Sequence, residues 1–297
     1  MNDIVYFNGG FLSRDQVQIS PNDRGWLLGD GVYEVAPSYG GAFLRLGLHL
    51  ERLGSSLAKM AIQGVDLVQM GAVSSELLRR NGLAEAPRAL VHFQISRGSA
   101  PRSHAFPVPP VPPTIYGFAA PFTRNPGCDA GAAIVTRSDF RWARCDIKAI
   151  SLAANCLANQ EAQAAGVYET VFVRDGIVLE GSHTNFFVIE RGVVRTAPLS
   201  NYILGGITRA IAIDLSQGAG IPVRQEALPE SDLATVDEAF LTGSTTEVMP
   251  IVSVNGRPVG TGVPGPITRR LSERFLEAAE RGPAPGGSGL PWSLVRP

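Results

Sequence analysis

The sequence has few cysteines and no long apolar segment. Its three cysteines, Cys128, Cys145 and Cys156, form no C-x-x-C pair, and an odd number without a secretory signal fits free thiols in a reducing compartment. The first residues, Met1-Asn-Asp-Ile, lack the basic and apolar regions of a signal peptide. No stretch of about 18 apolar residues occurs. We therefore expect a cytoplasmic protein without a disulfide bond or a membrane anchor.

The chain also lacks an excess of charge of either sign. Its formal net charge is −1, and it contains no basic run. Nucleic acids and anionic membranes bind clustered lysine and arginine, so we expect neither as the main partner. No metal-ligand pattern stands out either. The 297 residues, 44% of them hydrophobic, are enough for a substantial core in one large or two medium domains.

Lysine is nearly absent, because only Lys59 and Lys148 are lysines among the 26 basic residues. Arginine can replace lysine as a solvated charge, but its guanidinium stays protonated, whereas a lysine amine can form a Schiff base. Lys148 ends the stretch 141–148, just before a helix-prone run over residues 149–165, and is our candidate for a catalytic amine. The alternative is a lysine retained by chance at a helix start. Lys59 is expected on a solvated helix face.

The first third of the chain combines a hairpin, a glycine-rich segment and helices. Residues 4–12 predict a hairpin that turns at Asn8-Gly9. Residues 23–35 hold three glycines and predict a tight backbone approach leading into a strand. Apolar residues at helical spacing predict a helix over 48–62, with His49 and Arg52 on one side of it. A second helix is expected over residues 71–78.

A strand predicted over residues 89–96 runs into a Gly- and Pro-framed loop over 97–107. This loop carries Arg102 and His104, which could form an anion clamp. The alternative is a surface loop with incidental charges. The proline-dense segment 106–113 predicts extended polyproline geometry at the edge of the first domain.

Strands and helices alternate through the second half of the chain. A strand over 132–137, a helix over 151–165 and an amphipathic final helix over 266–281 are expected. Hairpin turns are predicted at Asp175-Gly176, Arg191-Gly192 and Asn255-Gly256. Several hairpins among helices indicate an α+β fold rather than a doubly wound parallel sheet. The tail from residue 282 is rich in Pro, Gly and Ser, which is typical of disorder.

Two segments of the second half have features of an anion site. A glycine turn opens a predicted helix over residues 204–215, and such a turn aims backbone N–H groups at an anion. Residues 240–247 predict a strand that ends in a hydroxyl-rich turn, which could add donors to the same anion.

Taken together, these segments resemble the fold-type IV pyridoxal-phosphate enzymes, most closely the D-amino-acid aminotransferases. The resemblance covers about residues 3 to 278, and the ordered set of motifs is specific, although no single motif would suffice. The motifs are Asp23-Arg-Gly, Gly29-Asp-Gly-Val-Tyr-Glu-Val35, His49-Leu-Glu-Arg52, Arg97-Gly-Ser-Ala-Pro-Arg-Ser-His104, Cys145-Asp-Ile-Lys148, Glu180-Gly-Ser-His-Thr-Asn185, Gly206-Ile-Thr-Arg209 and Thr242-Gly-Ser-Thr-Thr-Glu247.

The resemblance implies two domains: a small N-terminal α/β domain over residues 1–117 and a C-terminal cofactor-binding domain with a barrel-like β core over 125–281. Residues 118–124 would link them, and 282–297 would form the tail. It also implies a homodimer in which a first-domain loop covers the neighbour's cofactor. We expect residues 97–107 to be that loop.

The resemblance further implies that Lys148 carries pyridoxal 5′-phosphate as a Schiff base. Glu180 would face the pyridine nitrogen of the cofactor and keep it protonated. The phosphate would be held by Arg52, Ile207, Thr208 and Ser244. The freed Lys148 amine would then move a proton during the exchange of an amino group between a D-amino acid and a 2-oxo acid such as 2-oxoglutarate or pyruvate.

Substrate binding is expected from Tyr33, Arg102 and His104, which would hold the α-carboxylate, together with Ser244 and Thr245. The Arg-x-His pair argues for D-substrates, since branched-chain aminotransferases of this fold lack it. His183, beside the cofactor segment, departs from the pattern and has no expected role.

Other activities of the same fold stay open. An (R)-selective amine transaminase would use Lys148 and Glu180 but need no carboxylate clamp. Aminodeoxychorismate lyase would eliminate pyruvate, and a branched-chain aminotransferase would take L-substrates. From another class, a catalytically silent binding protein would have little reason to retain both Lys148 and Glu180.

Overall fold

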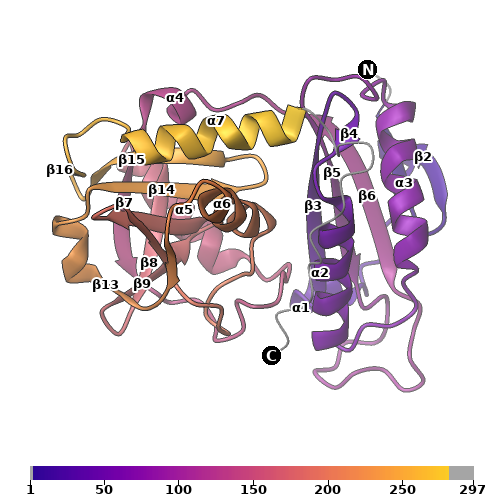
Figure 1. Cartoon of the computed structure of the whole chain (residues 1–297). Helices are drawn as coiled ribbons and strands as arrows, with labels where there is room; N and C mark the ends of the chain where they lie inside the picture. Colours follow the sequence, from indigo (N-terminus) through magenta and orange to yellow (C-terminus); the bar gives the residue numbers. More distant parts are fainter. Residues whose placement is uncertain (1–2, 281–297) are drawn as a thin grey trace.

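The computed structural model describes residues 3 to 280, and these form two lobes side by side, each built on its own β-sheet (Figure 1). The expected tail 282–297 lies outside the described residues. No helix within residues 3–280 is both long and apolar enough to cross a membrane.

The N-terminal lobe is an antiparallel six-stranded sheet in the order β2-β1-β6-β5-β3-β4. Two helices cover one face of this sheet, and their apolar sides bury its core residues (Figure 1). Its elements are β1 (Ile4–Phe7), β2 (Gly10–Ser13), a 3-10 turn η1 (Arg14–Gln16), α1 (Arg24–Leu28), β3 (Gly31–Tyr39), β4 (Ala42–Phe43), α2 (Leu46–Lys59), α3 (Leu67–Arg80), β5 (Ala89–Ser96) and β6 (Thr114–Pro121).

The C-terminal lobe is a ten-stranded sheet of which six strands close into a barrel. The ring runs β10-β14-β15-β7-β8-β9 and returns to β10 through the pairing of Glu180 with Asn185. Its elements are α4 (Gly127–Ala130), β7 (Ala132–Ser138), α5 (Ala153–Ala164), β8 (Glu169–Arg174), β9 (Ile177–Gly181), β10 (Asn185–Glu190), β11 (Val193–Thr196), α6 (Ile207–Gly218), β12 (Val223–Gln225), β13 (Leu228–Pro229), a 3-10 turn η2 (Glu230–Ala234), β14 (Glu238–Gly243), β15 (Glu247–Val254), β16 (Arg257–Pro258) and α7 (Pro266–Glu280).

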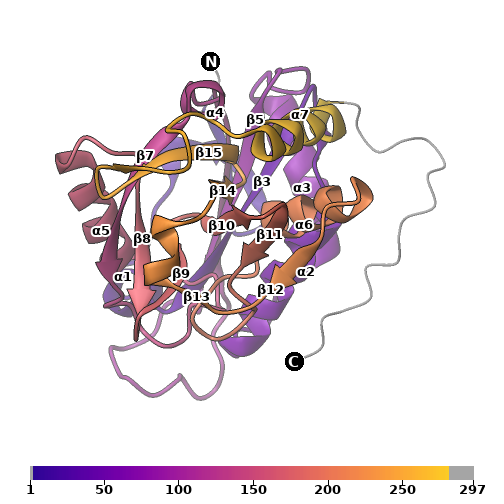
Figure 2. The ribbon, with the colours of Figure 1, turned by 60° about the vertical axis from the view of Figure 1, so that its left-hand side comes forward.

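Apolar side chains fill the barrel and also coat one side of it. The first cluster includes Ile134, Val171 and Met249, all fully buried. The second lies where α6 and α7 pack on the sheet, and it includes Phe187 and Phe240, whose rings stack at 4.6 Å. Figure 2 shows α5 on the opposite side of the barrel from α6 and α7. The barrel is therefore a rigid scaffold with helices on two sides.

The α+β fold with a barrel-like β core is confirmed, and so are the predicted hairpins. The turns at Asn8-Gly9, Asp175-Gly176, Arg191-Gly192 and Asn255-Gly256 each join two paired strands, and all of these turn residues have positive φ angles. The inner face expected for the last helix is also confirmed, because Leu271, Phe275 and Ala279 are buried.

The boundary between the two lobes differs from the prediction. β6 pairs with β5 as far as Pro121, so residues 118–121 of the predicted linker belong to the N-terminal sheet. The proline-dense segment 106–113 lies in the connection between β5 and β6, inside this lobe and not at its edge. Proline excludes regular strand there, but it does not mark a domain end. The predicted helix 151–165 begins only at Ala153, because the residues before it run against β3.

A buried carboxylate ties the two lobes together. Glu247, at the start of β15, is 1% exposed and accepts hydrogen bonds from Tyr39 Oη (3.1 Å), Arg88 Nε (3.0 Å) and Arg124 Nε (3.1 Å). Tyr39 ends β3, Arg88 precedes β5, and Arg124 lies between the lobes. Three donors from separate segments therefore share one buried carboxylate.

We predict that Glu247→Gln lowers the free energy of unfolding by roughly 3 kcal/mol, because it leaves two arginines without their buried counter-ion. Urea denaturation followed by circular dichroism measures this. Glu76→Gln is the matched control, since Glu76 pairs with Arg79 and Arg80 on the surface of α3 and should change stability little. Equal losses in the two variants would contradict the prediction.

Candidate active site

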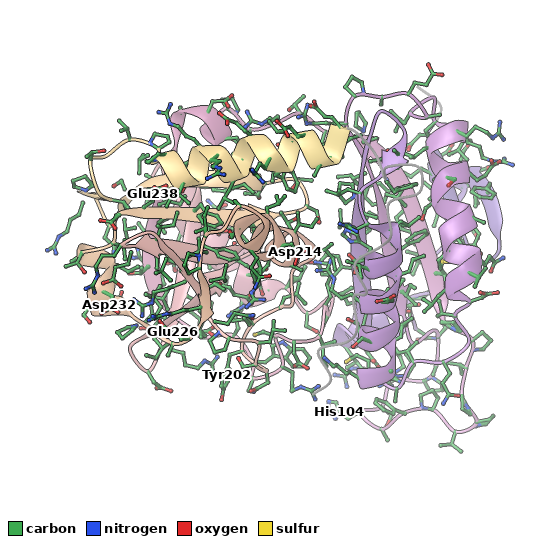
Figure 3. The ribbon with its side chains drawn as sticks, in the orientation of Figure 1. His104, Tyr202, Asp214, Glu226, Asp232 and Glu238 are labelled. Carbon is green, nitrogen blue, oxygen red and sulfur yellow. The ribbon has the colours of Figure 1, made fainter. Side chains whose placement is uncertain are left out.

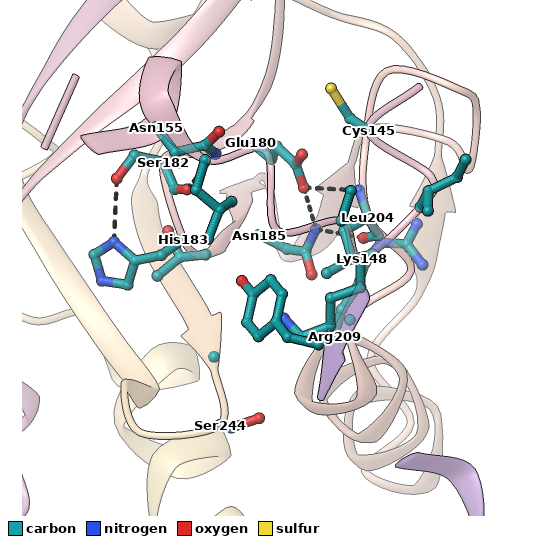
Figure 4. A pocket seen from close by; sticks show the side chains of 18 of the residues that line it. Cys145, Lys148, Asn155, Glu180, Ser182, His183, Asn185, Leu204, Arg209 and Ser244 are labelled. Carbon is teal, nitrogen blue, oxygen red and sulfur yellow. Dashed lines mark hydrogen bonds between the residues drawn. The ribbon is translucent and has the colours of Figure 1, made fainter. Parts of the chain in front are cut away.

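A pocket opens where the two lobes meet, and both lobes contribute to its lining (Figure 4). The predicted site residues in its wall are Tyr33, Arg52, Lys148, Glu180, Ile207, Thr208 and Ser244. Figure 4 shows Lys148, Glu180 and Ser244 around the same space, with His183 across from Lys148.

Lys148 is positioned by backbone pairing with the other lobe. Its carbonyl accepts from Tyr33 N (2.9 Å), Ile150 N donates to Gly31 O (3.1 Å), and its own N–H donates to Ser56 Oγ (3.2 Å). Its Nζ lies 4.1 Å from the centroid of the Tyr33 ring and has no hydrogen-bonding or ion-pair partner within residues 3–280. Lys59, in contrast, is 39% exposed and pairs with Asp146 at 3.0 Å. The backbone of Lys148 is thus held in place by hydrogen bonds, while its side-chain amine is left without a hydrogen-bonding partner among the described residues.

Glu180 is buried and hydrogen-bonded through both carboxylate oxygens. Arg141 Nη1 donates to Oε1 at 2.6 Å, while Asn185 Nδ2 and Leu204 N donate to Oε2 at 3.0 and 2.9 Å (Figure 4). Burial raises the pKa of Glu180 to about 7 even though Arg141 acts in the opposite direction. The sequence did not single out Arg141, although it begins the 141–148 stretch.

Arg141 is itself fixed by a second carboxylate. Asp139, which is fully buried, accepts from Arg141 Nε and Nη2 at 3.0 and 3.1 Å, and the guanidinium lies 4.2 Å from the centroid of the Phe172 ring. A planar group with five donors can satisfy Asp139 and Glu180 together, which a lysine could not. Arg141 therefore fixes the orientation of the Glu180 carboxylate.

The first turn of α6 provides backbone donors without a side-chain cap. Gly206 is its N-cap residue and makes no side-chain hydrogen bond to the helix. A Cβ on Gly206 would lie 2.0 Å from Asn185 Oδ1, so only glycine lets the chain approach so closely. Two buried polar atoms of the pocket lining, Thr242 Oγ1 and Arg209 Nε, have no hydrogen-bond partner among residues 3–280. A helix N-terminus beside unpaired donors is suited to a phosphate.

Arg52 lines the same end of the pocket and is oriented by Glu34. Its Nε donates to Glu34 Oε2 at 2.9 Å and its Nη1 to Gly205 O at 3.1 Å, next to the start of α6. His49 Nδ1 lies 2.9 Å from Glu34 Oε1. Burial would raise the pKa of Glu34, but Arg52 and His49 outweigh it and hold the pKa below its usual range. The predicted shared side of His49 and Arg52 is confirmed, whereas the role of Glu34 was missed.

His183 is held at the pocket rim by another buried carboxylate. Its Nδ1 lies 2.8 Å from Glu169 Oε2, and Ser182 Oγ donates to Glu169 Oε1 at 2.6 Å. The His183 side chain is 43% exposed while Glu169 is fully buried. Burial lowers the pKa of His183, but Glu169 outweighs this effect and raises it. The pair fixes the loop that follows Glu180.

Three predicted substrate residues lie outside this pocket. Arg102 and His104 are exposed on the β5–β6 loop, and Figure 3 shows His104 on that loop below the N-terminal lobe. Thr245 is exposed on the β14–β15 turn. The single chain therefore brings together the predicted cofactor residues and Tyr33, but not the expected carboxylate clamp.

Known proteins with similar sequences and structures are aminotransferases. The family model "Amino-transferase class IV" matches residues 31–254. D-alanine aminotransferase of Staphylococcus haemolyticus is 35% identical over 278 residues, covering 93% of this chain and 98% of the relative. A T.th. branched-chain amino acid aminotransferase, solved with N-(5′-phosphopyridoxyl)-L-glutamate, superposes with a TM-score of 0.86 at 26% identity over 96% of each chain. The Escherichia coli branched-chain enzyme, at 23% identity, has a TM-score of 0.88 over 97% of this chain and 98% of that one.

The raised pKa of Glu180 predicts a pH-dependent stability for protein stripped of bound small molecules. An acid with a higher pKa in the folded state stabilises the fold while protonated, and this contribution is lost as the pH rises through the folded pKa. The free energy of unfolding should therefore fall as the pH rises from about 4.5 to about 7. The Glu180→Gln variant should lack this part of the fall.

Urea unfolding across that pH range measures the difference between wild type and variant. Glu161→Gln is the control, because Glu161 is 48% exposed on α5 and should follow the wild type. A Glu180→Gln curve parallel to that of the wild type would show that Glu180 is ionised throughout.

Proposed function

The chain belongs to the class IV aminotransferases, and we propose that it transfers the amino group of a D-amino acid to a 2-oxo acid, using pyridoxal 5′-phosphate bound at Lys148. As an aminotransferase it acts on an amino acid and an oxo acid. The preference for D-amino acids is supported by its similarity to D-alanine aminotransferases over nearly the whole chain. The cofactor is supported by the family and by a structural relative solved with pyridoxamine 5′-phosphate.

One observation carries this proposal: the unpaired amine of Lys148 shares a pocket with the buried carboxylate of Glu180 and the uncapped start of α6. These are the three groups that pyridoxal phosphate needs, namely an amine for its carbonyl, an acid for its ring nitrogen and donors for its phosphate. The unpaired Thr242 hydroxyl and Arg209 Nε fit a polar ligand there. The residues proposed to hold the cofactor are Lys148, Glu180, Arg52, Ile207, Thr208 and Ser244.

When bound, pyridoxal phosphate supplies a ring that accepts the electrons released as the substrate Cα–H bond breaks. Glu180, whose carboxylate is fixed by Arg141 and Asn185, would face the ring nitrogen and keep a proton on it. With the cofactor bound, the Lys148 amine would take the proton from the substrate Cα and deliver it to C4′ of the cofactor, acting first as base and then as acid.

The α-carboxylate of the substrate requires a cation, and we propose that Arg102 and His104 supply it from a neighbouring subunit. Both are exposed and lie outside the pocket of their own chain. Within the pocket, Tyr33 stands over the lysine amine and would contact the substrate from this chain. The proposal therefore includes a homodimer whose sites each combine residues of two chains. Ser244, in the wall of the same pocket, and the adjacent Thr245 are also proposed to bind the substrate.

Reduction with borohydride should fix the cofactor to Lys148, and the adduct should be absent from Lys59, which is already paired with Asp146. Peptide mass spectrometry locates it. Lys148→Ala should lose transamination, whereas Lys59→Ala should keep it.

A panel of D- and L-amino acids and (R)-amines, with 2-oxoglutarate and pyruvate as acceptors, should show turnover of D-amino acids. Turnover of (R)-amines or L-amino acids alone would favour the amine or branched-chain activity instead.

Mixing Lys148→Ala and Arg102→Ala subunits should restore activity on D-amino acids. At a D-amino acid concentration well below the KM of the Arg102→Ala protein, the Lys148→Ala homodimer cannot react and the Arg102→Ala homodimer binds too little substrate. The heterodimer has one site with both groups intact and one with neither. Unfolding and refolding the mixed variants, with differently tagged chains, yields heterodimers that can be purified and assayed. Heterodimers without activity would show that Arg102 serves the pocket of its own chain, or none.

A further inference from the structure

The β5–β6 loop that carries Arg102 and His104 is held by a buried arginine from another segment. Arg24 Nη1 donates to Ser103 O at 2.7 Å and to Ala105 O at 3.2 Å, the two carbonyls on either side of His104. Arg24 is only 2% exposed and does not line the pocket. Arg24 is therefore not one of the residues proposed to hold the cofactor.

Arg24 is fixed in turn by Asp30, which it shares with Arg97. Arg24 Nε donates to Asp30 Oδ2 at 2.8 Å, and Arg97 Nε and Nη2 donate to the same carboxylate at 2.8 and 2.9 Å. Burial would raise the pKa of Asp30, but the two guanidinium groups outweigh it and keep the pKa below its usual range. Arg97 also donates to Met60 O and Ala61 O, just after α2. The cluster thus ties the loop to the body of the lobe.

Further contacts hold the loop on both sides of Arg102 and His104. Arg24 N donates to Gly98 O (3.0 Å) and Ala100 N to Asn22 O (3.2 Å), while the Phe106 ring centroid lies 3.4 Å from the Arg97 guanidinium. Gly98 has a φ of +101°, and a Cβ there would lie 2.0 Å from Pro112 O. The anchors therefore fall on residues 98, 100, 103, 105 and 106. They leave the side chains of Arg102 and His104 exposed between them.

We propose that Arg24 is a positioning residue that sets the direction of Arg102 and His104 and thereby the affinity for the substrate carboxylate. The inference rests on the proposed function, in which this pair binds that carboxylate. A guanidinium suits the task because it bonds a carboxylate through Nε and two carbonyls through Nη1 at fixed angles. A lysine would keep the charge beside Asp30 but lose this geometry. The Asp23-Arg-Gly motif, which the cofactor site leaves unused, gains a function here.

The test compares Arg24→Lys with wild type in two backgrounds, native and Arg102→Ala. In the native background Arg24→Lys should raise the KM for D-alanine roughly ten- to hundredfold, with kcat and the absorption of the bound cofactor little changed. In the Arg102→Ala background it should have no comparable effect, since Arg24 acts through a group that is already lost. Phe106→Leu removes the exposed ring that lies over Arg97. It should raise the KM less than Arg24→Lys does. This second variant keeps the inference testable if Arg24→Lys folds poorly.

The outcomes separate the inference from the function on which it rests. If Arg102→Ala leaves the KM for D-alanine unchanged, the proposed clamp is wrong and the positioning role falls with it. If Arg102→Ala raises the KM but Arg24→Lys and Phe106→Leu do not, only the inference is overturned. An equal loss from Arg24→Lys in both backgrounds, in kcat as well as KM, would also overturn it, because a general structural defect behaves in that way.

Discussion

The Glu180 side chain takes part in the closure of the barrel and also places a buried carboxylate in the wall of the pocket. β9 meets β10 at the single pair of Glu180 and Asn185, and the Glu180 carboxylate also accepts from Arg141 and from the backbone of Leu204. Three segments distant in sequence thus converge on one buried acid: the stretch that ends in Lys148, the first residue of β10 and the turn before α6. Because a buried carboxylate without donors is costly, the need to satisfy Glu180 brings the stretch that ends in Lys148 and the turn before α6 to the same carboxylate.

Other buried carboxylates of the fold are also bound by arginines. Glu34, Asp30, Glu247 and Asp139 are buried carboxylates, and each is bound by at least one arginine that contacts a second group. A guanidinium presents five donors in one plane, so one residue can join two segments, whereas an ammonium acts as a single flexible charge. Arginine is therefore the residue that connects the parts of this fold. Of the two lysines, Lys59 is ion-paired with Asp146, whereas the Lys148 amine has no such partner within residues 3–280.

Local signals in the sequence were sufficient for much of the fold, whereas most residues of the candidate site were expected from the resemblance of an ordered set of motifs. Asn-Gly and Asp-Gly pairs marked hairpins because they adopt positive φ angles. The scarcity of lysine drew attention to Lys148, one of only two lysines in the chain. The sequence did not predict the partners of Glu180, Glu34 or Asp30, since each pairing joins residues that are adjacent only after folding. The linker was misplaced because proline density reports local backbone geometry, whereas the end of β6 is decided by its pairing with β5. The loop with Arg102 and His104 could be recognised by composition, but composition did not show that both side chains lie outside the pocket of their own chain.

The backbone pairing of Lys148 with β3 limits how the enzyme can open. The lysine belongs to the C-terminal lobe in sequence but is hydrogen-bonded to Tyr33 and Ser56 of the other lobe, and Glu247 joins the lobes again at the far end of β3. A hinge motion that parted the lobes would break both attachments and displace the reactive amine. Ligand exchange that keeps both attachments intact therefore requires movement of surface loops around the pocket rather than separation of the lobes.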